Sequence, residues 1–228
     1  MKETICTIPI NDIFMPKDGC PFCRMEKMLE EQYVRFITGD AMMEPSVRIE
    51  TNKKGFCRRH FEQMQTEGQK LPNALILESH LQEIIDIHVP KKLRGKPDKK
   101  QLENLKKELS SCYVCDRIES DMHHFMATIF VEWAKGGEFR KLYNEQPFIC
   151  LKHYHFVMSA ATGKGGLSSK LIPDFYAETA ALTKNYLMSL KKDITHFCSM
   201  FDYRSQGQEW GTSIDAIERS TDFLTGKG

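Results

Sequence analysis

A cysteine–histidine pattern that occurs twice constrains this chain more than any other feature. Cys20-x-x-Cys23 is followed, 34 positions after its second cysteine, by Cys57-x-x-His60. The same order recurs later in the chain: Cys112-x-x-Cys115 is followed, 35 positions after Cys115, by Cys150-x-x-His153. Three cysteine thiols and one histidine imidazole are the four ligands of a tetrahedral zinc site, and such sites commonly take them from two short motifs. The sequence therefore predicts two Cys3His metal sites, one in each half of the chain.

The two motif sets belong to a longer repeat of about 90 residues. Their first cysteines lie 92 positions apart and their histidines 93. Arg48 lies 25 positions after Cys23, and Arg140 lies 25 positions after Cys115. Self-similarity at a fixed period indicates an internal duplication, in which each repeat is closed by its own Cys3His site.

The chain divides into four segments. Residues 1–88 are predicted to form the first helical metal-binding repeat, and residues 102–204 the second. Between them, residues 89–101 (VPKKLRGKPDKKQ) form a basic linker, whose proline, glycine and lysine content suits an exposed connection. Residues 205–228 form a polar C-terminal tail.

Apolar side chains recur at three- and four-residue spacing in four segments, which is the pattern of amphipathic helices. These segments are residues 21–38, Val114–Trp133, Leu77–His88 and a long C-terminal stretch, Phe175–Phe201. No alternating strand pattern of useful length is present. We therefore predict an all-α fold with two helical repeats, a long C-terminal helix and a polar tail.

The ligand spacing favours structural zinc. Positions i and i+3 share one face of a helical turn, and a helix N-terminus stabilises a thiolate. Four protein ligands leave no open position for water, which is typical of a structural site. We predict two zinc ions per chain. An iron–sulfur cluster is the alternative, although four cysteines usually hold such clusters. A redox-active Cys-x-x-Cys would need a strand–helix context, which the pattern lacks.

Composition and the N-terminal sequence favour a cytoplasmic protein. Hydrophobic residues make up 41% and charged residues 28%, and the net charge of +1 gives no global attraction to nucleic acid or to anionic membranes. We see no signal peptide and no apolar run of about 18 residues. Thiols stay reduced in the cytoplasm, which favours metal ligation over disulfides. Cys6 and Cys198 lie outside the pattern, and we expect them to be inert buried thiols.

Five segments carry a family resemblance: CPFCRMEKMLEEQYV, GFCRRHFEQM, CYVCDRIE, ICLKHYHFVM and FDYRSQGQEWGTSIDAIERSTDFLTG. Together they resemble a family of uncharacterised proteins from anaerobic bacteria, defined only as a domain of unknown function. The resemblance covers nearly the whole chain and implies metal binding at the eight motif residues, but no activity. It also implies that a C-terminal signature docks the tail or, alternatively, lines a pocket with Tyr203, Arg204 and Trp210. The residues of this signature are Asp202, Tyr203, Arg204, Trp210 and Gly211.

Three functional hypotheses follow. The chain has no His-Glu-x-x-His and no Gly-x-Ser-x-Gly motif, so we favour a non-enzymatic interaction or regulatory module with an unknown protein partner. The second hypothesis is a metal- or thiol-dependent enzyme or redox protein with an exchangeable metal at one site. The third is nucleic-acid binding through the basic linker, which we disfavour because a solvated linker explains the same lysines. The oligomeric state stays open.

Overall fold

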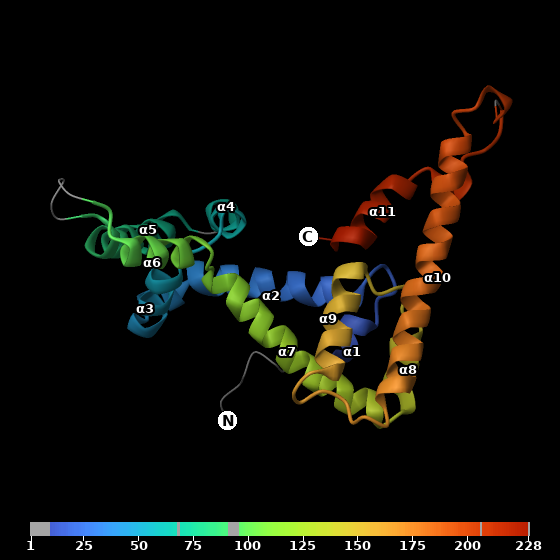
Figure 1. Cartoon of the computed structure of the whole chain (residues 1–228), viewed down its shortest axis with the longest axis horizontal. Coiled ribbons are helices and arrows are strands. Elements are labelled where there is room, and N and C mark those ends of the chain that lie inside the picture. The colour runs from blue at the N-terminus through green and yellow to red at the C-terminus, as the bar shows by residue number, and fades with distance from the viewer. Residues whose placement is uncertain (1–9, 68, 91–95, 206, 228) are drawn as a thin grey trace. The chain divides into compact units, whose positions relative to one another are not determined.

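The protein is all-α in the computed structural model (Figure 1), as the sequence predicts. The structure describes residues 10–67, 69–90, 96–205 and 207–227, and no strand occurs in these ranges. None of the helices formed by the described residues is long and apolar enough to cross a bilayer. The short 3-10 helices are η2 (Asp40–Met43), η3 (Tyr203–Ser205) and η4 (Gly211–Ser213). The α-helices are α1 (Ile10–Phe14), α2 (Pro21–Thr38), α3 (Pro45–Lys54), α4 (Arg58–Glu67), α5 (Lys70–His88), α6 (Lys99–Leu109), α7 (Tyr113–Ala134), α8 (Gly137–Asn144), α9 (Leu151–Thr162), α10 (Ile172–Ser199) and α11 (Ala216–Thr225).

The helices that carry the strongest apolar periodicity lie close to where the sequence predicts them. Helix α2 begins at Pro21, which suits a first helical turn because proline has no amide hydrogen to leave unpaired. Its apolar face buries Phe22, Met25 and Leu29 completely, whereas Phe36 is 43% exposed. Helices α7 and α10 likewise match their predicted segments, and α5 begins seven residues earlier than its pattern indicates.

The predicted linker and tail contain helices that the periodicity does not reveal. The last three linker residues, Lys99–Gln101, already belong to α6. A carboxylate oxygen of Asp98 accepts a hydrogen bond from the backbone N–H of Lys100 at 2.8 Å and so caps this helix. The linker residues Lys91, Lys92 and Arg94 lie outside the described residues. The C-terminal end of the predicted linker is therefore helical.

The chain forms two compact units. Unit 1 comprises Met1–Lys27 and Met122–Gly228, and unit 2 comprises Met28–Asp121. The boundaries fall inside α2 and α7, so each unit contains residues from both predicted repeats. The compact units are therefore not the sequence repeats, and the duplication stays a prediction about the sequence.

Aromatic side chains form the core of unit 1. Phe175 on α10 lies against the rings of Trp133 and Tyr143, with centroid distances of 5.0 and 5.6 Å. Helix α11 packs against α9 and α10, as Figure 1 shows, and buries Ala216 and Phe223 completely. The segment predicted as a polar tail therefore ends in an amphipathic helix that contributes to the core.

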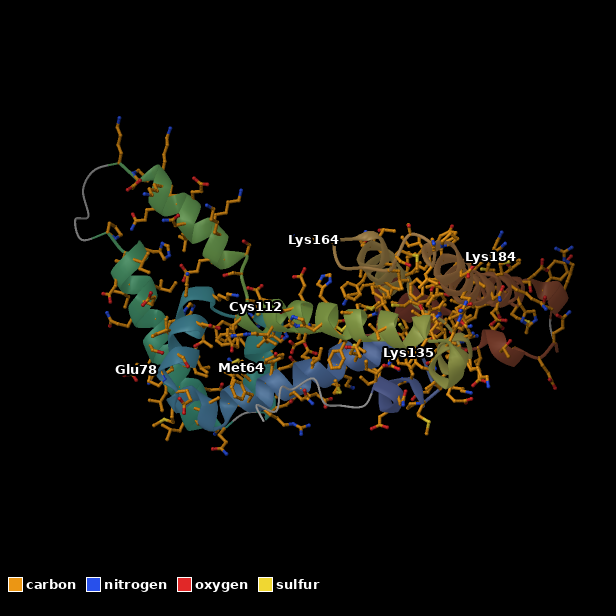
Figure 2. All side chains as sticks on the ribbon, turned by 90° about the horizontal axis from the view of Figure 1, so that it is seen from below. Met64, Glu78, Cys112, Lys135, Lys164 and Lys184 are labelled. Atoms are coloured by element: carbon orange, nitrogen blue, oxygen red, sulfur yellow. The ribbon has the colours of Figure 1, made fainter. Side chains whose placement is uncertain are left out.

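Unit 2 is built around α5, which packs against α3, α4 and α6. Met64 on α4, labelled in Figure 2, is 1% exposed, and Ile76 on α5 is 2% exposed. The amide side chain of Asn73 donates a hydrogen bond to the carbonyl oxygen of Met64 and links α5 to α4. This packing holds the segment around Cys57 in place at the start of α4.

Candidate metal centres

All eight predicted ligands gather in two clusters, one in each unit. Site A is formed by Cys20, Cys23, Cys150 and His153, and site B by Cys57, His60, Cys112 and Cys115. In each cluster, one candidate ligand atom from every residue lies within 4.8 Å of the others. Each cluster could therefore hold one metal ion among three sulfurs and one imidazole nitrogen.

The clusters correct the predicted pairing of the motifs. The sequence analysis places Cys20 and Cys23 with Cys57 and His60, so that each repeat closes its own site. Instead, the Cys-x-x-Cys of each repeat meets the Cys-x-x-His of the other. Helix length explains the difference. The 18 residues of α2 carry the chain about 27 Å outward at 1.5 Å per residue, and the 10 residues of α3 span only about 15 Å. The chain therefore reaches Cys57 before it can return to the start of α2.

Site A joins the N-terminus of α2 to the N-terminus of α9. The Sγ atoms of Cys23 and Cys150 lie 3.6 Å apart. Nδ1 of His153 lies 3.2 Å from the sulfur of Cys150, 3.3 Å from that of Cys23 and 3.8 Å from that of Cys20. All four residues are buried.

Site B joins the start of α4 to the start of α7. Nδ1 of His60 lies 3.2 Å from the sulfurs of Cys57 and Cys112 and 3.5 Å from that of Cys115. The sulfurs of Cys57 and Cys115 are 3.9 Å apart. Figure 2 labels Cys112, which lies at the start of α7.

Backbone contacts align the two segments of site B. The chain leaves α3 at Gly55, whose φ of 60° is the left-handed conformation that favours glycine. Its carbonyl oxygen accepts a hydrogen bond from the N–H of Tyr113 at 2.9 Å. The hydroxyl of Ser111 donates to the carbonyl oxygen of Lys54 at 2.6 Å. These contacts bring the residues before α4 beside those before α7.

A glutamate orients the histidine in each site. Nε2 of His60 lies 2.8 Å from a carboxylate oxygen of Glu30, and Nε2 of His153 lies 3.3 Å from one of Glu26. A carboxylate only accepts, so each Nε2 carries the proton and donates it. Nδ1 is then left with a lone pair directed at the sulfurs. Metal-binding histidines are typically held this way by a carboxylate on the other ring nitrogen.

The residue before each histidine is a cation that binds the same glutamate. Lys152 contacts both carboxylate oxygens of Glu26 at 2.6 Å, and Arg59 lies 2.7 Å from Glu30. Burial raises the pKa of Glu26, but the hydrogen bonds from His153 and Lys152 outweigh it and lower the pKa to about 2. Burial also raises the pKa of Glu30, but its partners hold the pKa below the usual value. Both glutamates are therefore charged and accept from the imidazole.

Crowding drives the thiol pKa values apart. Hydrogen bonds from Cys20 and Cys23 lower the pKa of Cys150 to about 3, whereas burial and the neighbouring sulfurs raise the pKa of Cys20 well above its usual value. In site B, a hydrogen bond from Cys115 lowers the pKa of Cys112 to about 3, and the pKa of Cys115 is raised in return. Three thiolates so close together repel one another. A bound divalent cation would let all of them ionise.

The two sites differ in exposure. In site B, Cys115 is exposed and Cys57 is partly exposed, whereas every residue of site A is buried. The end of α11 helps to cover site A, because a Cβ atom built on Gly226 would lie 3.8 Å from the sulfurs of Cys23 and Cys150. A chelator or an oxidant would therefore reach site B more easily.

The predicted C-terminal signature is only partly packed. The indole of Trp210 lies against the rings of Phe197 and Phe201, with centroid distances of 5.2 and 5.7 Å, which docks this segment on the end of α10. Tyr203 is 84% exposed, and Arg204 pairs with Asp202. A pocket formed by Tyr203, Arg204 and Trp210 stays a prediction.

Sequence reasoning missed the two glutamates and misjudged one free thiol. Glu26 and Glu30 lie one helical turn apart on α2, but their role depends on which histidine each one meets. The only local signal is the cation before each histidine, which needs a carboxylate partner.

Cys198, predicted to be buried, is exposed, and Cys6 lies outside the described residues.

Comparison with known proteins agrees with the resemblance seen in the sequence. No curated protein and no solved structure matches this chain. One family matches it over residues 1–228, and its description is a family of unknown function, DUF6062. Because this match covers the whole sequence that carries both Cys/His clusters, the chain belongs to the DUF6062 family.

Proposed function

We propose that this protein is a non-enzymatic helical module that two structural zinc ions hold together. The observation that carries the proposal is the histidine of each cluster, His60 or His153. Its Nδ1 faces three sulfurs, and its Nε2 donates to a charged glutamate. Two independent sites share this arrangement of ligand and supporting carboxylate, which is difficult to explain by core packing alone.

The distances support zinc. A tetrahedral Zn²⁺ with Zn–S of ~2.3 Å and Zn–N of ~2.05 Å has S···S edges of about 3.8 Å and S···N edges of about 3.6 Å. The S···S distance is 3.6 Å between Cys23 and Cys150 and 3.9 Å between Cys57 and Cys115, and the S···N distances run from 3.2 to 3.8 Å. These spacings support a single tetrahedral ion in each cluster, with all four ligand atoms within 4.8 Å of one another.

An iron–sulfur cluster fits less well. A cluster binds its ligands to separate iron atoms, which spreads the ligand atoms apart, and its usual ligand set is four cysteines. Here each set contains a histidine, and its four ligand atoms lie within 4.8 Å of one another. This compact Cys3His geometry favours a single ion.

An interaction or regulatory role in the cytoplasm is the proposal for the module as a whole. Four protein ligands close each site, so the metal would stabilise the fold and not bind substrate. The cytoplasm keeps the thiols reduced and available to the metal. Helices α5 and α6 also expose large aliphatic side chains, which supports contact with a protein partner. These residues are Leu71, Leu81, Ile85, Leu102 and Leu109.

Exposure at site B favours a second candidate function. The exposed Cys115 and the partly exposed Cys57 would give this site an exchangeable metal or an accessible thiol. The protein would then handle metal or thiol chemistry at site B, while site A keeps a structural role.

The deciding experiment is the metal content of anaerobically purified protein by plasma mass spectrometry, with an absorption spectrum of the same sample. We expect close to two zinc ions per chain and no visible absorption. Chelation should remove both ions and lower the thermal stability, because the binding free energy of a structural metal contributes to folding. Iron with acid-labile sulfide and a broad visible band would overturn the zinc proposal. Rapid exchange of one ion with no loss of fold would favour the second candidate.

A further inference from the structure

Unit 1 contains a cavity of about 370 Å³ directly beside site A. The N-terminal end of α2 forms one wall, and the sulfur-bearing residues Cys20 and Cys23 are part of it. Helix α11 and the residues that follow it form another wall, through Arg219 and Lys227. The cavity is large enough for a small organic molecule.

The walls carry more positive than negative charge. Four cations line the cavity, against the two carboxylates Asp18 and Asp222. This excess is local, because the whole chain has a net charge of only +1. Cations gathered on a concave surface attract ligands of negative charge. The four cations are Arg24, Lys27, Arg219 and Lys227.

Ion pairs hold the two arginines more closely than the two lysines. Arg24 is held by Asp18 and by the carbonyl oxygen of Ile13. Arg219 is held by Asp215 and Asp193, at 2.8 and 2.9 Å.

The lysines can turn toward a ligand. Lys27 is exposed and forms no ion pair within the part of the chain that the structure describes, and Lys227 is 4.0 Å from the carboxylate of Asp222. Carboxylates compensate the charge of both arginines, so the lysines are the cations that can supply direct contacts to an anion.

An aromatic pair forms the apolar part of the wall. The rings of Phe148 and Tyr186 are stacked, with centroids 4.0 Å apart and planes inclined by 15°. Phe223 packs behind both of them, with centroid distances of 5.8 and 5.6 Å. This rigid surface suits a planar apolar group better than a fully hydrated ion.

We propose that this cavity binds a small aromatic anion. Its carboxylate or phosphate lies among Lys27, Lys227 and Arg24, and its ring lies on the Phe148–Tyr186 pair. This binding goes beyond the zinc assignment and does not depend on the identity of the metal. If site A holds zinc, an occupied cavity also covers Cys20 and Cys23 and slows release of the metal from that site alone.

The test is titration calorimetry on the full-length, metal-loaded protein, with four probes. Phenyl phosphate and benzoate carry both the ring and the charge, inorganic phosphate carries only the charge, and benzyl alcohol carries only the ring. We expect both aromatic anions to bind at least ~10-fold more tightly than either partial probe, because each group contributes separately. The preference between phenyl phosphate and benzoate identifies the anionic group. No binding of either aromatic anion at millimolar concentration would overturn the proposal.

Matched charge variants separate a site from general attraction. Lys27→Glu with Lys227→Glu should weaken phenyl phosphate binding at least ~10-fold, because the two direct cations are reversed. Lys164→Glu with Lys184→Glu changes the net charge equally at exposed positions of the same unit, labelled in Figure 2, and should leave binding unchanged. Equal effects in the two variants would overturn the proposal. Metal content and Tm are measured on both variants, and Phe148→Leu tests the aromatic wall without a charge change.

Discussion

The sulfur of Cys23 lies 3.6 Å from the sulfur of Cys150, although 127 residues separate them in the chain. Cys23 belongs to the first motif set of the sequence and Cys150 to the second. Each site is therefore built from one motif of each set. Each metal ion would thereby connect segments that the backbone leaves far apart. Closing so long a loop costs the unfolded chain considerable entropy, which makes such a connection effective in stabilising the fold.

Double substitutions should show directly which cysteines share a site. Cys23→Ser with Cys150→Ser removes two ligands from site A only, so we expect this variant to keep about one zinc ion per chain. Cys23→Ser with Cys57→Ser removes one ligand from each site, so we expect both ions to be lost or weakly held. Native mass spectrometry and metal analysis would distinguish the two. If instead Cys23→Ser with Cys57→Ser kept one zinc ion and Cys23→Ser with Cys150→Ser lost both, each site would be formed within a single repeat.

The two sites should lose metal in order, site B first. Cys115 is exposed, whereas all four residues of site A are buried, so a chelator and an alkylating reagent reach site B more readily. During stepwise chelation, alkylation mapped by peptide mass spectrometry should appear at Cys115 before Cys23 and Cys150. Cys198 is exposed and outside both sites, so it should react from the start and serves as the internal reference. Simultaneous alkylation in both sites would argue against a difference in accessibility.

The glutamates should tune the affinity of one site each. Glu30→Gln removes the charged partner of His60, and we expect the zinc affinity of site B to fall on the order of 10-fold, the lower end for supporting residues of metal sites. Glu26→Gln is the matched variant and should act on site A through His153. Competition with a chromophoric chelator measures both constants. Equal weakening of both sites by either variant would show that the glutamates act on the fold in general.

The hydrogen bonds of the Glu178 carboxylate should contribute substantially to the stability of unit 1. Its carboxylate accepts hydrogen bonds at 3.0 Å from the indole N–H of Trp133 and from Nε of Arg140, whose guanidinium lies over the Trp133 ring. Glu178→Ala leaves these donors unpaired and should lower the free energy of unfolding by about 1–3 kcal/mol. Chemical denaturation of metal-loaded protein measures this loss. A loss no greater than that of an exposed glutamate, such as Glu138→Ala, would contradict the assignment.

The contribution of Glu178 should also depend on pH. Burial raises its pKa, but Arg140, Asn144 and Trp133 more than offset this, so the folded pKa lies below the usual value of 4.5. The unfolded chain then takes up the proton first as the pH falls. The stabilisation is therefore complete above about pH 4.5 and is lost as the pH falls through the folded pKa. The difference in Tm between the native protein and Glu178→Gln should be largest at neutral pH and shrink below pH 4.5. A difference that does not vary with pH would show that the charge of Glu178 is not involved.

Local features of the structure could be read directly from the sequence. The apolar spacing of Phe22, Met25 and Leu29 locates α2, because a helix depends mainly on contacts between residues three and four apart. The Cys-x-x-Cys and Cys-x-x-His spacing identifies all eight clustered residues for the same reason. Helix α11 escaped prediction because its segment is short and largely polar, and it is ordered by packing Phe223 into the core of unit 1.

The sequence by itself determined the helical class, the main helices and the chemical identity of both ligand sets. Only the tertiary structure decided which cysteine pair meets which histidine pair, which glutamate orients each imidazole, and which site is exposed. Spacing along a helix is a local property, whereas these pairings depend on the lengths and packing of several rigid helices. The 18 residues of α2 extend the chain further than α3 can bring it back, and so Cys23 meets Cys150 and not Cys57.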